Sequence, residues 1–228
     1  QGGPSQWLSS GITNLRGVYW EVERDTLIAI PLFIFMGIML QKSKIAEDLL
    51  VTMANLFGPV PGGLGISVVF VGALLAATTG IVGATVVAMG LISLPSMLRN
   101  KYSPSLATGT IAASGTLASL IPPSIIMVIY AILTEQSVAL LLMAGLVPGL
   151  LSAAMYMGGI FAIAKLRPDM APRSKVQIKW KERVHSLKGV WGIAFLFLLV
   201  IGGIYTGFFV PTYAGAVGAF GAFLIVLA

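Results

Sequence analysis

Long stretches without a charged side chain dominate the sequence, and they predict helices that lie in a membrane. The first covers residues 26–40. The later ones cover residues 64–98, 104–133, 138–164, 189–209 and 213–228. A bilayer takes about 20 apolar helical residues to cross, so stretches of this length and polarity indicate helices that span or enter it. The pattern therefore predicts an all-α polytopic membrane protein.

The polar segments predict how these helices are joined. Residues 1–25 mix polar and aromatic side chains, which is typical of a periplasmic or interfacial segment. In residues 43–57 the apolar positions fall on one helical face, with Glu47 and Asp48 near the start. An interfacial amphipathic helix, lying on the membrane rather than crossing it, fits this second pattern.

The stretch 64–98 has an unusual length for a membrane segment. A single straight helix of its 35 residues would be about 52 Å long, more than the hydrocarbon thickness. Two full spans would need roughly 40 residues and a turn. We therefore expect a re-entrant helical hairpin whose tip is the Thr- and Gly-rich segment 78–85. A pair of helices packed through these small residues remains the alternative.

The stretch 104–133 contains two consecutive prolines, Pro122 and Pro123. Each lacks a backbone N–H, and the second moves the first out of the α region, so a helix cannot continue through them. Carbonyl groups are left open near the middle of the membrane, which hydrocarbon does not tolerate without protein or a polar site to cover them. A break over residues 115–124 therefore predicts an ion or substrate site.

Composition and charge narrow the class further. The chain is 57% apolar and 10% charged, and it has no cysteine, which excludes disulfides and thiolate chemistry. Residues 165–188 hold eight of the fourteen basic residues, which marks a cytoplasmic loop. Counting crossings back from this loop puts Arg99, Lys101, Lys42 and Lys44 on the cytoplasmic side. The same count puts the acidic turn at Glu135 on the opposite, outer side of the membrane.

Four motifs resemble the large membrane subunit of TRAP transporters, the tripartite ATP-independent periplasmic transporters. They are IPLFIFMG (30–37), TGIVGATVV (79–87), ATGT (107–110) leading to GTL (115–117), and IPPS (121–124). The tip is most similar to the branch labelled mannitol/chloroaromatic-type. Ile81 stands where many members have serine, which removes a side-chain ligand, and Tyr213 stands where the family commonly has glutamate. The resemblance implies that the chain corresponds to the N-terminal half of such a DctM-like subunit.

The resemblance implies an ion-transporter-type fold of two inverted repeats. Residues 26–164 would form the first repeat, with the re-entrant hairpin 64–98 and the broken helix 104–133, and residues 189–228 would begin the second. It implies a sodium-coupled, binding-protein-dependent secondary transporter that imports a small organic acid by elevator-type alternating access. The expected partners are a small DctQ-like membrane subunit, a periplasmic substrate-binding protein and a small anionic substrate. The expected location is a bacterial or archaeal inner membrane.

The candidate ion and substrate ligands lie at the hairpin tip and at the helix break. The resemblance indicates sodium as the coupling ion, held mainly by backbone carbonyls, with no organic cofactor. The candidates are Thr78, Thr79, Gly80 and Gly83 at the tip, and Ser114, Gly115, Thr116, Pro122, Pro123 and Ser124 at the break.

Other classes of function fit the sequence less well. A membrane-embedded hydrolase would need a base within the bilayer, and none of the predicted spans contains His, Lys, Asp or Glu. No Gly-rich phosphate loop with lysine is present, so ATP hydrolysis is not expected. We expect no enzyme and no nucleic-acid partner. A stand-alone sodium/dicarboxylate symporter of related fold, or a structural membrane subunit, remains the alternative.

Overall fold

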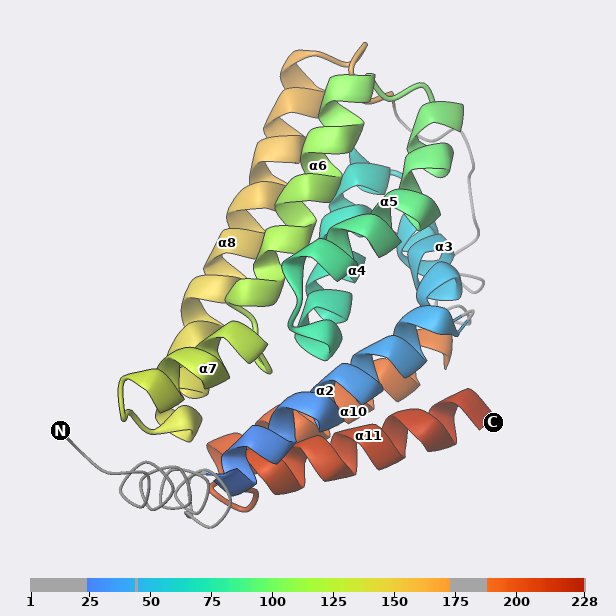
Figure 1. Ribbon diagram of the computed structural model, residues 1–228. Coiled ribbons are helices and arrows are strands. Elements are labelled where there is room, and N and C mark those ends of the chain that lie inside the picture. Colours follow the sequence, from blue (N-terminus) through green and yellow to red (C-terminus); the bar gives the residue numbers. More distant parts are fainter. Residues whose placement is uncertain (1–23, 44, 173–187, 228) are drawn as a thin grey trace, which may run out of the picture.

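The computed structural model describes residues 24–43, 45–172 and 188–227, and these are helical almost throughout (Figure 1). The predicted interfacial segment 1–25 and the basic loop 165–188 fall mostly outside these residues. The elements are α2 (Arg24–Lys42), α3 (Ile45–Phe57), α4 (Gly63–Thr79), α5 (Val82–Arg99), α6 (Pro104–Thr116), the short 3-10 helix η1 (Leu117–Ser119), α7 (Ile125–Leu133), α8 (Val138–Leu166), α10 (Lys188–Tyr205) and α11 (Pro211–Leu227). The all-α prediction is confirmed.

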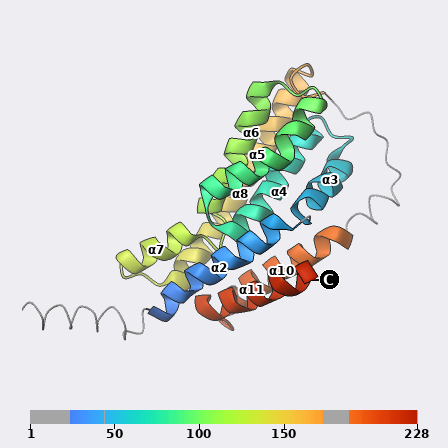
Figure 2. The ribbon, with the colours of Figure 1, turned by 45° about the vertical axis from the view of Figure 1, so that its right-hand side comes forward.

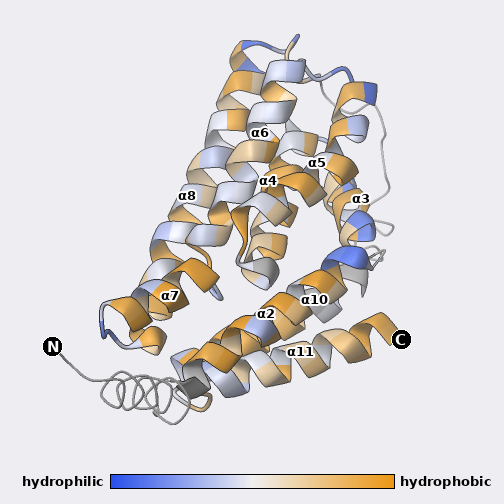
Figure 3. Ribbon diagram, in the orientation of Figure 1, coloured by the Kyte–Doolittle hydropathy of each residue, from blue (hydrophilic) through white to orange (hydrophobic). Residues whose placement is uncertain are grey.

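The helices are compatible with a membrane protein. Among the described residues, α5 and α8 are long and apolar enough to cross a bilayer. The pair α2 and α3, bent by 66°, would make a third crossing if it forms one span. Large apolar side chains stand on the outer surface, including Leu91 (75% exposed) and Val147 (71%). Figure 3 shows polar residues gathered at helix ends and turns instead. An apolar exterior with polar ends suits burial in lipid.

Two groups of helices pack against each other (Figures 1 and 2). The first contains α4, α5, α6 and α8, and the second contains α2, α10 and α11. Glycines bring the second group close together. A side chain at Gly215 of α11 would lie 3.2 Å from Leu32 Cβ, and one at Gly218 would lie 2.6 Å from Met36 Sδ. Helix α4 contacts helices of both groups, so it links them.

Helices α4 and α5 form a hairpin whose two ends meet. The Gly65 N–H near the start of α4 donates to the Tyr102 hydroxyl, just beyond α5, at 3.4 Å. Burial raises the pKa of the Tyr102 phenol, and backbone hydrogen bonding at Gly65 and Leu64 partly offsets that shift. The Ser103 N–H donates to Met170 O at 2.9 Å, so the hairpin ends also lie beside the segment that follows α8. The two ends of the hairpin therefore lie at the end of the molecule where the basic loop begins.

The two arms of the hairpin are longer than a half-crossing. Helix α4 has 17 residues and α5 has 18, so each is about 26 Å long, close to the thickness of the hydrocarbon core. The interpretation as a re-entrant hairpin predicts half-length arms, which the helices exceed. The lengths of α4 and α5 therefore allow two complete crossings as well as a re-entrant hairpin. The depth that the tip reaches in the membrane distinguishes the two.

The predicted break in the stretch 104–133 is present. Helix α6 begins with Ser103 as N-cap and Pro104 at the first helical position. Its α-helical part ends at Thr116 and is followed by the 3-10 turn η1. The Pro122–Pro123 peptide bond is cis, and α7 starts at Ile125. The irregular segment is therefore residues 117–124. Gly115 and Thr116, which the sequence placed inside the break, still belong to α6.

Candidate functional site

The hairpin tip is a two-residue turn between α4 and α5. Helix α4 is closed by Gly80, whose N–H donates to Ala76 O at 2.9 Å. Gly80 has φ +59°, in the left-handed region that favours glycine, and Ile81 is extended before α5 begins. The tip predicted at 78–85 is thus narrowed to Gly80 and Ile81.

The tip touches the irregular segment of the broken helix. A Cβ on Gly80 would lie 2.8 Å from Pro123 O and 2.9 Å from Ile125 N, both of them backbone atoms. Only a residue without a side chain allows this approach. The tip and the break are therefore in contact, and the Pro123 carbonyl lies at this contact.

Two further contacts between small residues hold the hairpin against α6. A Cβ on Gly72 of α4 would lie 2.6 Å from Ser114 Cβ. A Cβ on Gly115 would overlap the side chain of Val86 and lie 3.1 Å from its backbone nitrogen. Both arms of the hairpin therefore approach α6 through positions that have no room for a larger side chain.

The hydroxyl groups at the site are tied to nearby backbone. Thr78 donates to Leu75 O and Ser114 donates to Ile111 O, each at 2.8 Å, and both side chains are buried. Ser124 caps α7 by accepting from Met127 N at 3.4 Å, and its hydroxyl donates to Ser119 O at 3.0 Å. Each hydroxyl oxygen therefore keeps lone-pair capacity for a further partner.

The structure brings most, but not all, of the candidate residues to this contact. Thr78, Gly80, Pro122, Pro123 and Ser124 gather where the tip meets the break, and Ser114 and Gly115 lie on the adjoining face of α6. Gly83 is exposed, and a Cβ added to it would meet nothing within 4 Å. Thr116 is also exposed and faces α8, with its hydroxyl 3.4 Å from that of Tyr156. Thr79 is the last residue of α4, and its side chain lies outside the described part of the chain.

Helix α8 supports the break from the other side. A Cβ on Gly145 would lie 2.7 Å from Leu120 O, and one on Gly149 would lie 3.2 Å from Ile121 N. The two glycines are four residues apart, a spacing typical of closely packed helices, and the segment 120–121 is the backbone that packs against them. No comparable signal singles out Gly72 in the sequence, because its contact with Ser114 joins helices far apart in the chain.

Thr110 is a buried residue that no sequence motif indicates as a ligand. It is 4% exposed, and within the described part of the chain its hydroxyl has no hydrogen-bond partner. It lies one helical turn before Ser114 on the same face of α6. A buried hydroxyl without a partner is costly, so a substitution at this position is a useful functional test.

Little open space remains where the tip and the break meet the second group of helices. A cavity of about 10 Å³ lies between Thr78, Pro123, Met36 of α2 and three residues of α10: Leu196, Phe197 and Val200. That volume is about the space of one water molecule. The described residues therefore enclose no room for an organic substrate at this point.

The end of α2 lies against the tip, which the charges had not predicted. The Gln41 side-chain amide donates to Ala84 O at 3.3 Å, and Lys42 lines a cavity of about 520 Å³ together with Gly83 and Ala84. Arg99 is about 24 Å farther along α5 than Gly83. The distribution of basic residues predicts Lys42 and Arg99 at one membrane surface, but the structure places them at opposite ends of α5.

The chemistry of the site is that of neutral oxygen atoms. The polar atoms of the candidate residues are carbonyl and hydroxyl oxygens and backbone N–H groups, and none of these residues is charged. No group of three or more His, Asp or Glu side chains that could bind a metal occurs within residues 24–43, 45–172 and 188–227. Neutral oxygens suit a hard monovalent cation better than a transition metal.

Comparison with known proteins identifies the family. A family profile described as "Tripartite ATP-independent periplasmic transporter, DctM component" matches residues 12–228. The chain belongs to this DctM family. The C4-dicarboxylate TRAP transporter large permease protein DctM of Pseudomonas aeruginosa is 40% identical over 199 residues, 86% of this chain and 45% of the relative. The protein of the same name from Rhodobacter capsulatus is 36% identical, covering 91% of this chain and 50% of the relative.

A third DctM relative has another substrate in its name. The ectoine/5-hydroxyectoine TRAP transporter large permease protein UehC of Ruegeria pomeroyi is 35% identical over 84% of this chain and 44% of the relative. These names do not support the mannitol/chloroaromatic branch that the tip motif had suggested. They are names of transporter permeases and not of enzymes, in agreement with the prediction. The chain spans about half the length of these relatives.

Proposed function

We propose that this chain is part of the large permease subunit of a sodium-coupled secondary transporter that imports a small organic acid. The observation that carries the proposal is the contact of Gly80 with the Pro123 carbonyl. It joins a hairpin tip and a broken helix, the arrangement in which secondary transporters hold ions and substrates. The residues at the contact supply uncharged oxygens, which a sodium ion accepts as ligands.

Helix ends add an electrostatic argument for this site. Helix α4 ends at the tip and α6 ends close to the break, so their C-terminal carbonyls point toward a shared region. The C-terminus of a helix favours a cation. Helices α5 and α7 begin at the same two places, and their N-termini favour an anionic group. These helix ends therefore favour a sodium ion at this point, and they favour an anionic substrate group beside it only in a state in which the surrounding helices open the space of about 10 Å³.

The position of the tip supports a re-entrant hairpin. Ile121, close to the tip, contacts Gly149 of α8. From Gly149 back to its first residue, Val138, α8 continues for about 16 Å. The tip thus stops well short of the far end of α8. This favours a hairpin that enters the membrane partway, over a pair of complete crossings.

The position of Lys42, which lies beside Gly83 and far from Arg99 along α5, supports an elevator-type movement. If Lys42 and Arg99 both mark the cytoplasmic surface in some state of the protein, α5 must be able to slide along α2 by about the length that separates them, roughly 24 Å. In the present arrangement the hairpin would be displaced toward the cytoplasm relative to α2. We infer that α4 to α8 move as the transport unit and that α2, α10 and α11 form the scaffold, as the first of two inverted repeats and the start of the second.

Partners and location follow from the family. We propose a small DctQ-like membrane subunit and a periplasmic substrate-binding protein as partners, in a bacterial or archaeal inner membrane, with residues 165–188 in the cytoplasm. The relatives' names include C4-dicarboxylate and ectoine, which supports a small organic acid as the substrate class. The DctMQ relative from Oleidesulfovibrio alaskensis is named an isethionate permease, which fits the same class.

The proposal is tested by uptake into proteoliposomes that contain the complete permease, with its small subunit, and a panel of labelled carboxylates. We expect uptake only with an inward sodium gradient and with the binding protein present. Uptake that is unchanged when potassium replaces sodium would exclude sodium coupling. Uptake without any binding protein would favour a stand-alone symporter. No uptake of any substrate in a correctly assembled complex would favour a structural subunit.

A further inference from the structure

Two side chains of the proposed scaffold donate hydrogen bonds to backbone carbonyls of the proposed transport unit. The Tyr205 hydroxyl at the end of α10 donates to Met143 O of α8 at 2.7 Å. The Gln41 amide at the end of α2 donates to Ala84 O in the first turn of α5 at 3.3 Å. The bonded residues are 62 and 43 positions apart in the sequence, on either side of the boundary between the two groups of helices. A movement of one group along the other must therefore break both bonds.

The Tyr205 bond attaches to the part of α8 that supports the break. Its acceptor, Met143 O, lies in the turn before Pro148, which is inside α8. Because Pro148 has no N–H, the helix lacks one hydrogen bond there and bends more easily. Gly149, next to this proline, packs against the backbone of Ile121 in the break. Tyr205 therefore joins the scaffold to the stretch of α8 on which the break rests.

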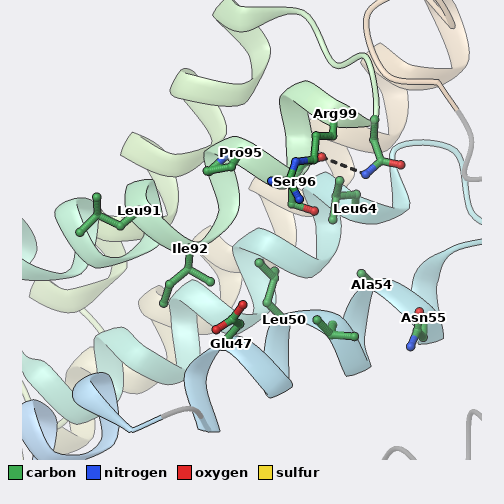
Figure 4. A pocket seen from close by; sticks show the side chains of 12 residues that line it. Glu47, Leu50, Ala54, Asn55, Leu64, Leu91, Ile92, Pro95, Ser96 and Arg99 are labelled. Atoms are coloured by element: carbon green, nitrogen blue, oxygen red, sulfur yellow. Dashed lines mark hydrogen bonds between the residues drawn. The ribbon is translucent and has the colours of Figure 1, made fainter.

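Open space lies along the boundary near both bonds. A groove of about 560 Å³ separates α3 from α5, with Leu50 and Ile92 among its lining residues (Figure 4). A neighbouring cavity of about 520 Å³ reaches Gln41 and Ala84. Near the end of α10, a cavity of about 460 Å³ lies between the α7–α8 turn and the start of α11. A boundary with such gaps buries less apolar surface than a closely packed one. Individual hydrogen bonds therefore contribute a larger share of what holds the two groups in this arrangement.

We propose that Tyr205 and Gln41 form a latch that holds the two groups of helices in the present arrangement and releases when the transport unit moves. The latch rests on the elevator-type movement proposed for α4 to α8, and both residues act by positioning helices. A hydrogen bond inside a membrane protein changes an equilibrium by about threefold on average, equivalent to about 0.6 kcal/mol. The two bonds share no partner and break in the same step, so together they change it by about tenfold.

The test measures how the complete permease divides between the present arrangement and the displaced one. The chain has no cysteine, so spin labels can be attached after Leu166→Cys on α8 and Trp191→Cys on α10, in a permease whose other segments are also free of cysteine. These two positions are 81% and 72% exposed. Sliding by roughly 24 Å would produce two separate distance populations. The distances are measured by pulsed electron spin resonance in lipid nanodiscs without sodium or substrate.

We expect the ratio of the present arrangement to the displaced one to fall about threefold in Tyr205→Phe and in Gln41→Met, and about tenfold in the double variant. Each substitution removes the donor and keeps the size of the side chain. Tyr213→Phe and Gln136→Met are the matched controls and should leave the ratio unchanged. The Tyr213 hydroxyl has no hydrogen-bond partner within the described part of the chain. The Gln136 amide donates to Thr134 O at 3.3 Å, inside the transport unit.

Unchanged ratios in Tyr205→Phe and Gln41→Met would overturn the latch, and so would equal shifts in the control variants. A lower midpoint of thermal unfolding with an unchanged ratio would also overturn it, because the two residues would then only stabilise the fold. A single distance population in every variant, with sodium-driven uptake by the unmodified permease, would overturn the latch and the sliding of α5 but not sodium coupling. The expected shifts in a permease whose uptake does not depend on sodium would support the latch and overturn sodium coupling alone.

Discussion

Replacing Gly80 by alanine puts a methyl group on the hairpin tip, directed at the backbone of the broken helix. Two costs follow. The residue keeps a left-handed conformation, which costs an L-amino acid about 1–2 kcal/mol. The new Cβ would also lie 2.8 Å from Pro123 O and 2.9 Å from Ile125 N. Neither backbone atom can rotate away, so the tip must withdraw by roughly 0.5 Å to reach ordinary van der Waals contact.

Together these costs give an expected loss of about 2 kcal/mol for the state in which tip and break are in contact. If sodium binds at this contact, its affinity should fall by about 30-fold, because 1.4 kcal/mol corresponds to a factor of ten. Without sodium the tip can withdraw from the break and avoid most of this cost, so the midpoint of thermal unfolding should fall by less than the roughly 4–8 °C that about 2 kcal/mol would give for a chain of this size.

The assay is thermal unfolding of the purified permease in detergent across a sodium chloride titration, with potassium chloride keeping the ionic strength constant. A bound ion raises the midpoint in proportion to RT ln(1 + [Na⁺]/Kd), which gives the apparent affinity without a known substrate. Gly83→Ala is the matched control. Gly83 lies three residues away with nothing near its Cβ direction, so alanine there should be neutral or stabilise α5 by up to about 1 kcal/mol. A Gly80→Ala protein with the same sodium dependence as Gly83→Ala would refute the assignment of the site.

Three other substitutions test the surroundings of the site. Gly72→Ala should destabilise the protein by about 1–3 kcal/mol because it forces α4 away from α6. Gly90→Ala is the control, because a Cβ there meets open space, and it should not destabilise the protein. Equal midpoints of thermal unfolding for the two variants would show that α4 and α6 separate without cost. Ser124→Ala should cost about 1 kcal/mol of cap stability and weaken sodium binding. Ser137→Ala removes the matching cap of α8 and should leave the sodium titration unchanged. Weaker sodium binding in both Ser124→Ala and Ser137→Ala would contradict a local role of Ser124 in sodium binding. Thr110→Val should stabilise the protein by about 1 kcal/mol if the buried hydroxyl has no partner and no function. Loss of sodium-driven uptake with unchanged stability would instead show that the Thr110 hydroxyl takes part in transport.

The sequence predicted the positions where the backbone leaves the helix. Two adjacent prolines cannot continue an α-helix, so the break near Pro122 followed from covalent structure alone. The turn at Gly80 followed from length, because a stretch too long for one helix must fold back near its most flexible residue. The start of α6 was also readable, since Ser103 and Pro104 form a recognised pair of cap and first-turn residues.

Distances between helices could not be read from the sequence in the same way. The distribution of basic residues indicates a side of the membrane, but it does not say how far a helix has moved along its neighbour. For this reason Lys42 was placed level with Arg99, although Lys42 lies beside Gly83. The contact of Gly72 with Ser114 was missed for a related reason. A glycine inside an apolar helix looks the same whether it faces lipid or another helix.

The small cavity at Thr78 and Pro123 has a kinetic consequence. A space of about 10 Å³ holds no more than one water molecule, so no continuous file of water passes through it. Solutes would then cross only when the surrounding helices rearrange, and such collective motions take microseconds to milliseconds. If the proposed function is right, the complete permease should accordingly have the limited turnover number of a carrier and show no ion currents of the size that an open channel produces.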